Sequence, residues 1–449
     1  MRGSSTVTTT NCTHYYSSTK KKCQIIYIYN TKIKETYCYT YIYIHIYILI
    51  YITIQDLKIK LKVYNILRNM SAFTRPDLPA FEIAGRKIGP QYPPYVIAEI
   101  SCNFAYAKEG PWGPAGKDYN RCVELIKLAA AAKCDAVKIQ SYKADTITMK
   151  CEKPPFMIKG AKVELWNEQS LHSLYEKNSM PWEWTEPLMK VAKEHGMVLF
   201  SSPFDETAVD YLEKLDAPCY KIASFESTDH GLLRKVAATG KPIIMSTGMS
   251  SVQDIDESIN VLRNAGVKQL AVLKCTSAYP ALPKDANVAG VKVIQDTWNV
   301  VPGLSDHTLG NEVAMAAVAL GACIIEKHII LDRSHPTADA PFSLTGEEFK
   351  VLVSSARIVK EAIGSAHIAF GKTKKENQSK KWRRSIFVVK DIKKGEKFVK
   401  GVNVRSIRPA DGLHTRHWDL VLGSTATKDI EEGTPLSFNL LDTDADIDI

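Results

Sequence analysis

Eight short apolar runs between residues 95 and 329 constrain the fold more than any other feature of the sequence. Segments with the 3.6-residue periodicity of helices separate them, as at 119–132, 207–215, 251–265 and 309–321. In one of these segments Ala208, Tyr211, Leu212 and Leu215 form the apolar stripe of a helix that covers a sheet. The eight runs are 95–100, 136–140, 197–203, 219–224, 242–248, 270–277, 300–307 and 323–329.

Eight strand-and-helix units over about 260 residues predict a (β/α)8 TIM barrel, which is an α/β fold. The alternative is an open, doubly wound sheet. No G-x-G-x-x-G segment opens a helix in this chain, which counts against a dinucleotide-binding domain. We therefore predict a TIM barrel.

The remaining sequence divides into segments of different character. We predict a barrel domain over 90–356, a linker over 357–382, and a small β-rich domain over 383–443, in which 429–435 resembles the turn at 391–396. Residues 1–70 differ from the rest, and Tyr and Ile alternate over 39–52. We interpret 1–70 as a non-native or disordered extension, translated from upstream DNA, with Met70 as the natural start.

Composition and charge exclude several classes of protein. The chain is 45% apolar and 24% charged, as globular proteins are, and its ten cysteines include no C-x-x-C pair, which indicates reduced thiols in the cytoplasm. The Tyr–Ile run is too short and too rich in tyrosine for a membrane helix. Of the net charge of +9, residues 366–408 supply +11. Because that stretch contains no known nucleic-acid-binding module, we expect it to steer small anions and not to bind nucleic acid.

Polar side chains fall at one end of nearly every predicted strand. In a barrel the carboxyl ends of the strands meet at one face and carry the active site. We therefore expect these residues to lie close together. They are Glu99, Lys138, Gln140, Ser201, Ser202, Lys221, Ser224, Ser246, Thr247, Thr276, Ser277, Ser305, His307, Glu326 and His328.

Two histidines, His307 and His328, end consecutive predicted strands on either side of one helix. A single buried histidine is more often a core residue than a ligand. Two neutral imidazoles that converge on one point at the edge of a sheet are typical of a metal site. We therefore predict that this pair binds a metal ion.

Lys138 and Lys221 lie next to strand ends with serines around them. Ammonium groups, hydroxyls and backbone amides can receive a phosphate together with a carboxylate, although each lysine alone could instead extend to the surface. Glu226 follows Lys221 closely and is a candidate general base or acid. With a metal that polarises a carbonyl, this set indicates phosphoenolpyruvate condensing with an aldehyde.

Seven motifs follow one another along the chain: VKIQ at 137–140, SSPFD at 201–205, YKIASFE at 220–226, STGM at 246–249, KCTSAYP at 274–280, GLSDHTLG at 303–310 and EKH at 326–328. Together they resemble the sialic acid synthase family, and the likeness extends over essentially 94–441. The tail resembles the family's antifreeze-like (SAF) domain, and PWEW at 181–184, ASFE at 223–226 and DAPFSL at 339–344 look most like the pseudaminic acid synthases.

The resemblance implies a metal-dependent condensation of phosphoenolpyruvate with an N-acetylated (di-N-acetamido) 6-deoxyhexose, which gives a nine-carbon nonulosonic acid and phosphate. It implies that His307 and His328 bind Mn²⁺ or Mg²⁺ and that Glu226 transfers a proton. It also implies a domain-swapped homodimer in which Arg408 enters the partner's site. The implied phosphoenolpyruvate contacts are Lys138, Ser202, Lys221, Ser224, Ser246, Ser277 and Ser305, and the implied sugar contacts are Glu99, Gln140, Tyr279, Asp339 and Arg408.

One segment departs from the family pattern, and other functions remain open. After Glu99 the chain keeps Asn103 but then carries extra residues through Gly116, so the first loop of the barrel is altered. N-acetylneuraminic or legionaminic acid is an alternative product. An aldolase with a Schiff-base lysine and a catalytically retired interaction scaffold are alternatives of other kinds, although the scaffold would be expected to lack His307, His328, Lys138 or Glu226.

Overall fold

The computed structural model describes residues 80–105, 116–160, 168–334, 337–364 and 373–442. The predicted extension over 1–70 lies outside these residues, as does most of the altered loop between Asn103 and Gly116. Within the described part of the chain, no helix is long and apolar enough to cross a membrane.

Eight parallel strands close into a barrel in the order β10-β3-β4-β5-β6-β7-β8-β9, which confirms the predicted TIM barrel. Their cores are almost continuously apolar, as expected for strands buried on both faces. Register sets the chemistry at their carboxyl ends, because Glu99 pairs with both His328 and Lys138, and Ser305 pairs with Glu326. The strands are β3 (Tyr95–Glu99), β4 (Ala136–Ser141), β5 (Val198–Pro203), β6 (Tyr220–Ile222), β7 (Ile243–Ser246), β8 (Leu270–Cys275), β9 (Val301–Asp306) and β10 (Ile324–His328).

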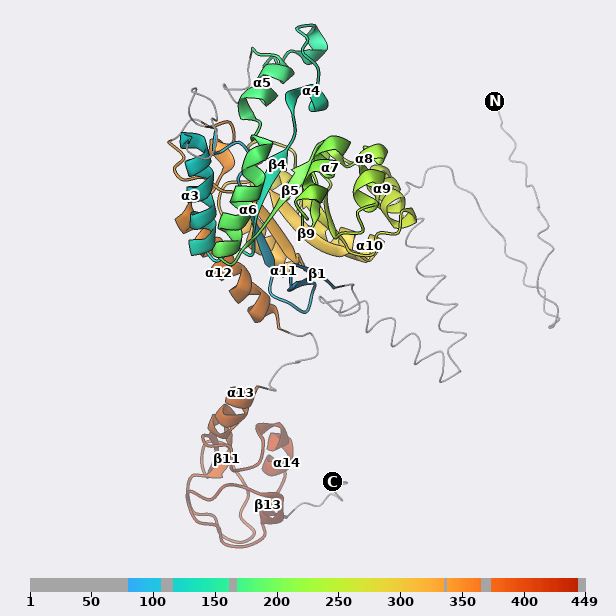
Figure 1. The fold of residues 1–449 in the computed structure, drawn as a ribbon. Coiled ribbons are helices and arrows are strands. Elements are labelled where there is room, and N and C mark those ends of the chain that lie inside the picture. Colours follow the sequence, from blue (N-terminus) through green and yellow to red (C-terminus); the bar gives the residue numbers. More distant parts are fainter. Residues whose placement is uncertain (1–79, 106–115, 161–167, 335–336, 365–372, 443–449) are drawn as a thin grey trace, which may run out of the picture. The chain divides into compact units, whose positions relative to one another are not determined.

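Helices surround the strands and bury one face each against them (Figure 1). In α7 the buried residues are Ala208, Val209 and Leu212, and Asp205 caps the helix by accepting the amides of Thr207 and Ala208. The helices are α3 (Lys117–Ala131), α6 (Thr185–Glu194), α7 (Glu206–Lys214), α8 (His230–Ala237), α9 (Val252–Asn264), α10 (Gly290–Trp298), α11 (Glu312–Ala319) and α12 (Gly346–Ile363).

Two further elements complete the barrel. A hairpin of β1 (Phe81–Ile83) and β2 (Arg86–Ile88) places Phe81, Ile83 and Ile88 in one apolar cluster with Tyr95, the first residue of β3. The long connection between β4 and α6 contains α4 (Ala144–Ile147) and α5 (Leu171–Asn178), which extend beyond the strands (Figure 1). Because β4 ends at Ser141, this connection begins at the carboxyl face of the barrel.

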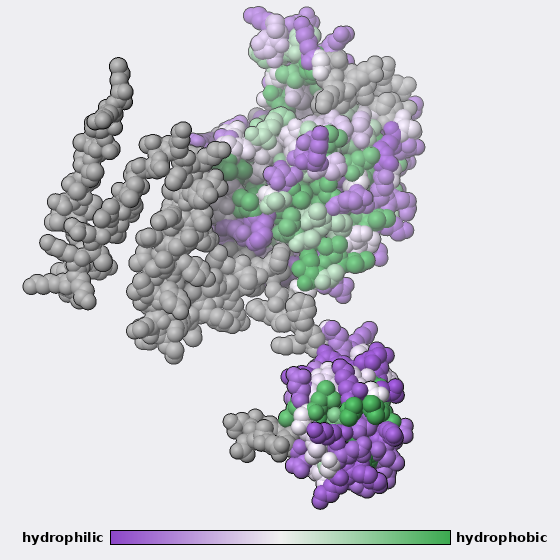
Figure 2. Space-filling model, turned by 180° about the vertical axis from the view of Figure 1, so that it is seen from behind, coloured by the Kyte–Doolittle hydropathy of each residue, from purple (hydrophilic) through white to green (hydrophobic). Residues whose placement is uncertain are grey.

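The C-terminal part folds around a small core of its own, which confirms the predicted β-rich domain type. Its two similar turns pair with each other: Ile392 and Ile430 exchange backbone hydrogen bonds, Asp391 accepts the Glu432 amide, and Asp429 accepts the Lys394 amide. Its surface is largely hydrophilic, with a band of apolar residues on the face seen in Figure 2. The elements are α13 (Lys374–Ser379), β11 (Ser385–Val388), β12 (Val404–Ile407), α14 (Trp418–Leu422), β13 (Thr425–Ala426) and β14 (Leu441–Asp442).

Candidate active site

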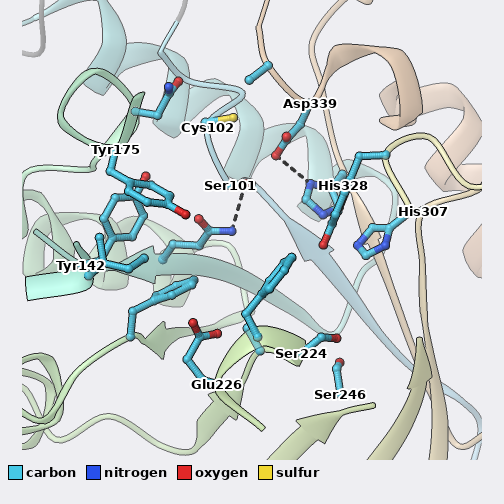
Figure 3. A pocket seen from close by; sticks show the side chains of 18 of the residues that line it. Ser101, Cys102, Tyr142, Tyr175, Ser224, Glu226, Ser246, His307, His328 and Asp339 are labelled. Carbon is cyan, nitrogen blue, oxygen red and sulfur yellow. Dashed lines mark hydrogen bonds and ion pairs between the residues drawn. The ribbon is translucent and has the colours of Figure 1, made fainter. Parts of the chain in front are cut away.

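A cavity of about 580 Å³ opens at the carboxyl ends of the barrel strands. Figure 3 shows His307, His328 and Asp339 on one side, Tyr142 and Tyr175 on the other, and Glu226 with two serines below them. The predicted site residues that line this cavity are Lys138, Gln140, Lys221, Ser224, Glu226, Ser246, Tyr279, Ser305, His307, His328 and Asp339.

Four predicted residues do not line the cavity. Glu99 and Ser202 are buried behind it and contact the ammonium group of Lys138. Ser277 lies close to Ser224, which lines the cavity. A Cβ atom placed on Gly248 would lie 2.0 Å from the Ser277 Oγ atom and 2.7 Å from the Ser224 Oγ atom, so both hydroxyl groups lie beside Gly248. Arg408 follows β12 in the C-terminal part of the chain and is not among the described residues that line this cavity.

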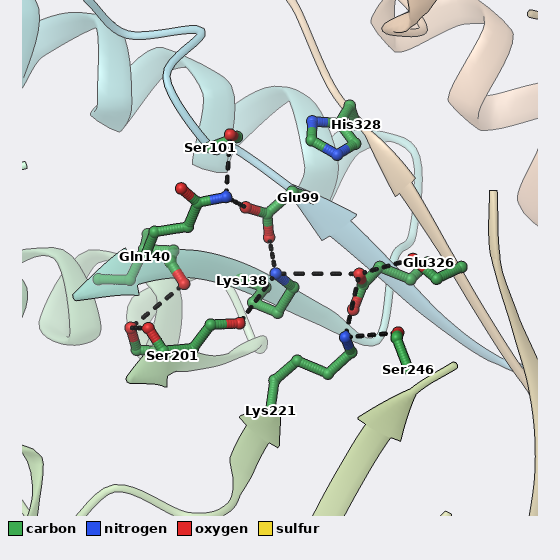
Figure 4. Close-up of polar contacts among 12 residues, drawn as sticks. Glu99, Ser101, Lys138, Gln140, Ser201, Lys221, Ser246, Glu326 and His328 are labelled. Carbon is green, nitrogen blue, oxygen red and sulfur yellow. Dashed lines mark hydrogen bonds and ion pairs between the residues drawn. The ribbon is translucent and has the colours of Figure 1, made fainter. Parts of the chain in front are cut away.

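A buried network of lysines and glutamates forms the base of the cavity (Figure 4). The Lys138 Nζ atom lies 2.5 Å from the Glu99 carboxylate and 3.2 Å from the Ser202 Oγ atom, and the Lys221 Nζ atom lies 2.6 Å from the Ser246 Oγ atom. The Glu326 Oε1 atom lies 3.8 Å from both Nζ atoms. The formal charges of the two lysines and two glutamates therefore balance.

The two lysines titrate differently because their neighbours differ. Burial opposes the charge of Lys138, but the carboxylates of Glu326 and Glu99 overcome this effect and raise its pKa. Burial dominates at Lys221 and lowers its pKa, despite the attraction of Glu326. Lys138 is therefore the more firmly charged of the two.

Each lysine retains a hydrogen-bond donor for a ligand. An ammonium group has three N–H donors. Among the described residues, Lys138 donates to Glu99 and Ser202, and Lys221 donates to Ser246 and to the carbonyl of Ile222. At 3.8 Å the Glu326 carboxylate is beyond hydrogen-bond distance of either lysine. One donor of each lysine can thus bind an anion.

A tight turn after β7 brings backbone and hydroxyl donors to the same end of the cavity. The amide of Gly248 donates to the Ser224 Oγ atom at 3.1 Å. Ser277 lies so close that any side chain at position 248 would overlap it. The buried Ser277 Oγ atom has no hydrogen-bond partner among the described residues. Such hydroxyls and amides suit the oxygens of a phosphate or carboxylate.

His307 and His328 face each other with their ring centres 5.3 Å apart. The Nδ1 atom of His307 lies 3.0 Å from the Thr276 carbonyl, and that of His328 lies 3.3 Å from the Asp339 carboxylate. Each of these contacts favours a proton on Nδ1 and leaves the Nε2 lone pair free, which is the arrangement found around metal-binding histidines. The two imidazoles therefore fit a divalent metal, although no group of three or more His, Cys, Asp and Glu residues in the described ranges is arranged to hold one.

The chain on either side of the histidines fixes their position. Phe342 is fully buried and packs edge-on against both rings. Asn103 donates to the Ile329 carbonyl and to Ser343 and accepts from Thr337. These bonds tie the loop after β3 to the residues around Asp339.

A buried ion pair lies directly beside the two histidines in the sequence. The Lys327 Nζ atom lies 2.7 Å from the Asp306 carboxylate and 2.6 Å from the Thr308 carbonyl. Lys327 is 0% exposed and Asp306 3%. Because Asp306 and Lys327 are paired residues of β9 and β10, this contact fixes the two strand ends that carry His307 and His328.

Glu226 lies in a short 3-10 turn after β6 and lines the cavity. Burial raises the pKa of Glu226 from its usual 4.5 to about 7, against the opposing attraction of Lys221 and Lys138. Its Oε2 atom has no hydrogen-bond partner among the described residues. A carboxyl group with a pKa near neutrality, next to a cavity, suits proton transfer.

Comparison with known proteins identifies the family to which this chain belongs. The NeuB family model matches residues 125–368, more than half of the chain, and the SAF domain model matches residues 383–442. The chain belongs to the NeuB family. The pseudaminic acid synthase of Campylobacter jejuni subsp. jejuni serotype O:23/36 (strain 81-176) is 38% identical over 342 residues, which cover 76% of this chain and 95% of that relative. The pseudaminic acid synthase of Helicobacter pylori is 36% identical over 351 residues, which cover 77% of this chain and 97% of the relative.

Solved structures of related proteins share the fold of this NeuB family member. The N-acetylneuraminic acid synthetase of Leptospira borgpetersenii, in complex with citrate, has a TM-score of 0.57 and 25% identity and covers 67% of this chain and 95% of its own. The spore coat polysaccharide biosynthesis protein SpsE of Bacillus subtilis has a TM-score of 0.53 and 30% identity, over 82% of this chain and 100% of its own.

Sequence reasoning missed part of the site of this NeuB family protein. Glu326 was noted only as a polar strand end, yet it lies between both lysines. Phe342 lies within the DAPFSL motif, but nothing in the motif indicates contact with the histidines. The residues between β4 and α6 that line the cavity were not predicted at all. Their only signal is the unusual length of that connection, from Ser141 to Thr185.

Proposed function

We propose that the protein condenses phosphoenolpyruvate with a diacetamido 6-deoxyhexose, as a pseudaminic acid synthase does. The observation that carries the proposal is that Lys138, Lys221, Glu226, His307 and His328 line one cavity. Identities of 36–38% to pseudaminic acid synthases, over nearly the whole length of those relatives, support the choice of sugar. A cytoplasmic setting fits the described cysteines, all of which are free thiols.

Phosphoenolpyruvate binds at the lysine end in this proposal. The free donors of Lys138 and Lys221 and the hydroxyls of Ser224, Ser246 and Ser277 hold its phosphate and carboxylate. Ser202 and Glu99 hold the ammonium group of Lys138 in place. Because the free site is electrically balanced, Glu326 keeps the lysine pair stable until the anionic substrate arrives.

The sugar enters as its open-chain aldehyde, with the carbonyl group directed toward the two histidines. A divalent metal, Mn²⁺ or Mg²⁺, held by His307 and His328 would polarise that carbonyl. Gln140, Tyr279 and Asp339 line the same cavity and orient the sugar's polar groups. The methylene carbon of phosphoenolpyruvate then forms a bond to the aldehyde carbon.

Glu226 acts on the water that completes the reaction. Bond formation leaves the phosphate-bearing carbon electron-deficient, and water adds to it while the Glu226 carboxylate accepts a proton from that water. The carbon–oxygen bond to phosphate then breaks as the hydroxyl group on that carbon becomes the keto group, and the two protons of the water pass to the former aldehyde oxygen and to the phosphate. The products are the nine-carbon nonulosonic acid and inorganic phosphate, so the atoms balance without another reactant.

A phosphate-release assay tests the proposed activity. With phosphoenolpyruvate and Mn²⁺, we expect the purified full-length protein to release phosphate with the diacetamido 6-deoxyhexose that is the precursor of pseudaminic acid, and more slowly with N-acetylmannosamine. A preference for the precursor of legionaminic acid would instead assign the protein to that sugar. No release with any acetamido sugar would refute the proposal.

The variant His307→Ala serves as the control for metal dependence. Loss of one of two imidazole ligands should abolish phosphate release and weaken Mn²⁺ binding at least about tenfold. Binding of Mn²⁺ is measured by electron paramagnetic resonance on the same samples, and circular dichroism checks that the barrel remains folded. Full activity of the variant would disprove the metal role of His307.

We further propose that Arg408 completes the site of a second subunit in a domain-swapped homodimer. Arg408→Ala and Glu226→Gln should each be nearly inactive alone. When the two variants are mixed and reassembled, half of the dimers are mixed and each holds one intact site, so about a quarter of the wild-type activity should return. If Arg408 instead served its own subunit, mixing would restore nothing, and if it served no site, Arg408→Ala alone would remain active.

A further inference from the structure

One wall of the cavity is built from aliphatic side chains of a single connection. Ile147, Ile158, Leu171 and Leu174 line the cavity, and all four lie between β4 and α6. We refer to these four residues as the apolar wall. Each is partly exposed, as expected for side chains that face a space open to a ligand.

Several contacts hold the apolar wall in place. Ile158 exchanges backbone hydrogen bonds of 3.0 Å with Glu168 and Gln169, which brings the two sides of the connection together. The buried His172 of α5 lies 2.8 Å from the Asp145 carboxylate of α4. The wall is therefore formed before a ligand arrives, which favours selective binding.

Contacts between aromatic side chains connect the apolar wall to the barrel. Tyr142, directly after β4, makes edge-on contacts with Tyr175 of α5 and with Phe204, which follows β5, at ring-centre distances of 5.7 and 5.3 Å. Tyr142 and Tyr175 lie across the cavity from His307 and His328 in Figure 3. The cavity thus has a charged end and an apolar end.

The two ends suit different parts of one substrate. Phosphoenolpyruvate and the reacting carbonyl group need the lysines and histidines, so the rest of the sugar must extend toward the apolar wall. Moving a methyl group from water to this wall lowers the free energy of binding. A hydroxyl group in contact with these four side chains loses its bonds to water, because aliphatic groups cannot replace them, whereas Tyr142, Tyr175 and Asn178 of the same connection also line the cavity and can bind polar groups of the sugar.

We propose that the apolar wall determines sugar specificity by receiving the methyl-bearing substituents of the sugar and excluding hydroxylated counterparts. This inference rests on the proposed function and assigns its selectivity to residues that hold neither the phosphate nor the carbonyl group. One methyl group in an apolar pocket changes kcat/KM by about 10- to 100-fold. A discrimination of this size is therefore expected between a 6-deoxy sugar and its hydroxylated analogue.

Leu174→Asn, of similar size but polar, tests the inference. We compare kcat/KM for the diacetamido 6-deoxyhexose and for N-acetylmannosamine, which carries hydroxyls where the first sugar has an acetamido and a methyl group. The variant should lose about tenfold in its preference for the first sugar, while the KM for phosphoenolpyruvate stays unchanged. Ile158→Asn, on a different part of the wall, should shift the preference the same way and provides a second test if Leu174→Asn does not fold.

Two controls make the result specific. Met149→Gln changes a 56% exposed residue of the same connection that does not line the cavity, and it should alter neither sugar's kcat/KM. Leu174→Met keeps the wall apolar and should retain the preference. If Leu174→Asn and Ile158→Asn are folded and active with an unchanged ratio, the inference is wrong. Failure of the wild-type protein with every sugar would instead overturn the proposed function.

Discussion

Replacing Glu226 by glutamine is expected to lower kcat about 100- to 10,000-fold, the usual contribution of one proton-transfer group. Glutamine keeps the shape of the side chain but cannot accept a proton from water. The KM for phosphoenolpyruvate should change little, because Lys138, Lys221 and the serines bind that substrate in our proposal. Steady-state phosphate release measures both quantities.

The pH dependence of the wild-type protein should report the same residue. Burial raises the pKa of Glu226 to about 7, and the reaction that we propose needs the ionised carboxylate. Activity should therefore rise with pH through about 7 and then level off. The residual activity of Glu226→Gln should not show this rise with pH.

The pH dependence of the free energy of unfolding tests the raised pKa of Glu226 independently of activity. Its pKa is 4.5 when unperturbed and about 7 in the folded protein, so the folded state holds the proton more tightly between these values. The contribution of Glu226 to folding is consequently lost as pH rises from about 4.5 through 7. Glu206→Gln, an exposed glutamate on α7, is the control and should leave both activity and this pH dependence unchanged. If the activity of Glu226→Gln still rose with pH through about 7, Glu226 would be excluded as the base.

The second large effect is expected at the buried ion pair beside the histidines. Asp306→Asn leaves the Lys327 ammonium group buried without its carboxylate, which should lower the free energy of unfolding by about 3–5 kcal/mol. Burial already lowers the pKa of Lys327, so some of this loss will be relieved by deprotonation. Chemical unfolding, followed on the barrel transition, measures the loss.

The partner variant should be milder. In Lys327→Met the Asp306 carboxylate keeps hydrogen bonds from the amide and hydroxyl of Thr308, at 2.9 and 2.7 Å. The double variant should recover part of the stability lost in Asp306→Asn. Lys241→Met removes a lysine from partly exposed ion pairs with Glu213 and Asp216 and should cost only about 0–1 kcal/mol. Equal losses in Lys241→Met and Asp306→Asn would contradict the role assigned to the buried pair.

The same variants should affect the metal site. Asp306 and Lys327 each precede a histidine, so loosening this pair frees the two strand ends to move. Mn²⁺ binding should weaken in Asp306→Asn although neither imidazole is changed. Retained Mn²⁺ affinity in a folded variant would show that the histidines do not depend on the pair.

The barrel strands were predictable because parallel strands buried on both faces consist of nearly continuous apolar runs. The polar strand ends were predictable for the same reason, since Glu99, Lys138, Lys221 and His307 interrupt apolar runs at equivalent places. Candidate site residues that lie on the barrel strands can therefore be predicted from the sequence.

The missing parts of the prediction depend on contacts that no local pattern encodes. Asp306 and Lys327 were visible as parts of motifs, but their mutual contact follows from the register of β9 and β10. The helices α4 and α5 are short and carry no long periodic stripe. Leu171 and Leu174 come to line the cavity only in the folded protein, and no local sequence pattern indicates this.

The connection between β4 and α6 has a consequence for how such a protein can change. It leaves the barrel after Ser141 and rejoins it at Thr185, so evolution or a protein engineer can exchange it as one cassette. The groups assigned to the chemistry lie outside this connection and are retained in such an exchange. In our proposal, exchange of this single connection would therefore change the sugar preference while the groups that carry out the reaction are retained.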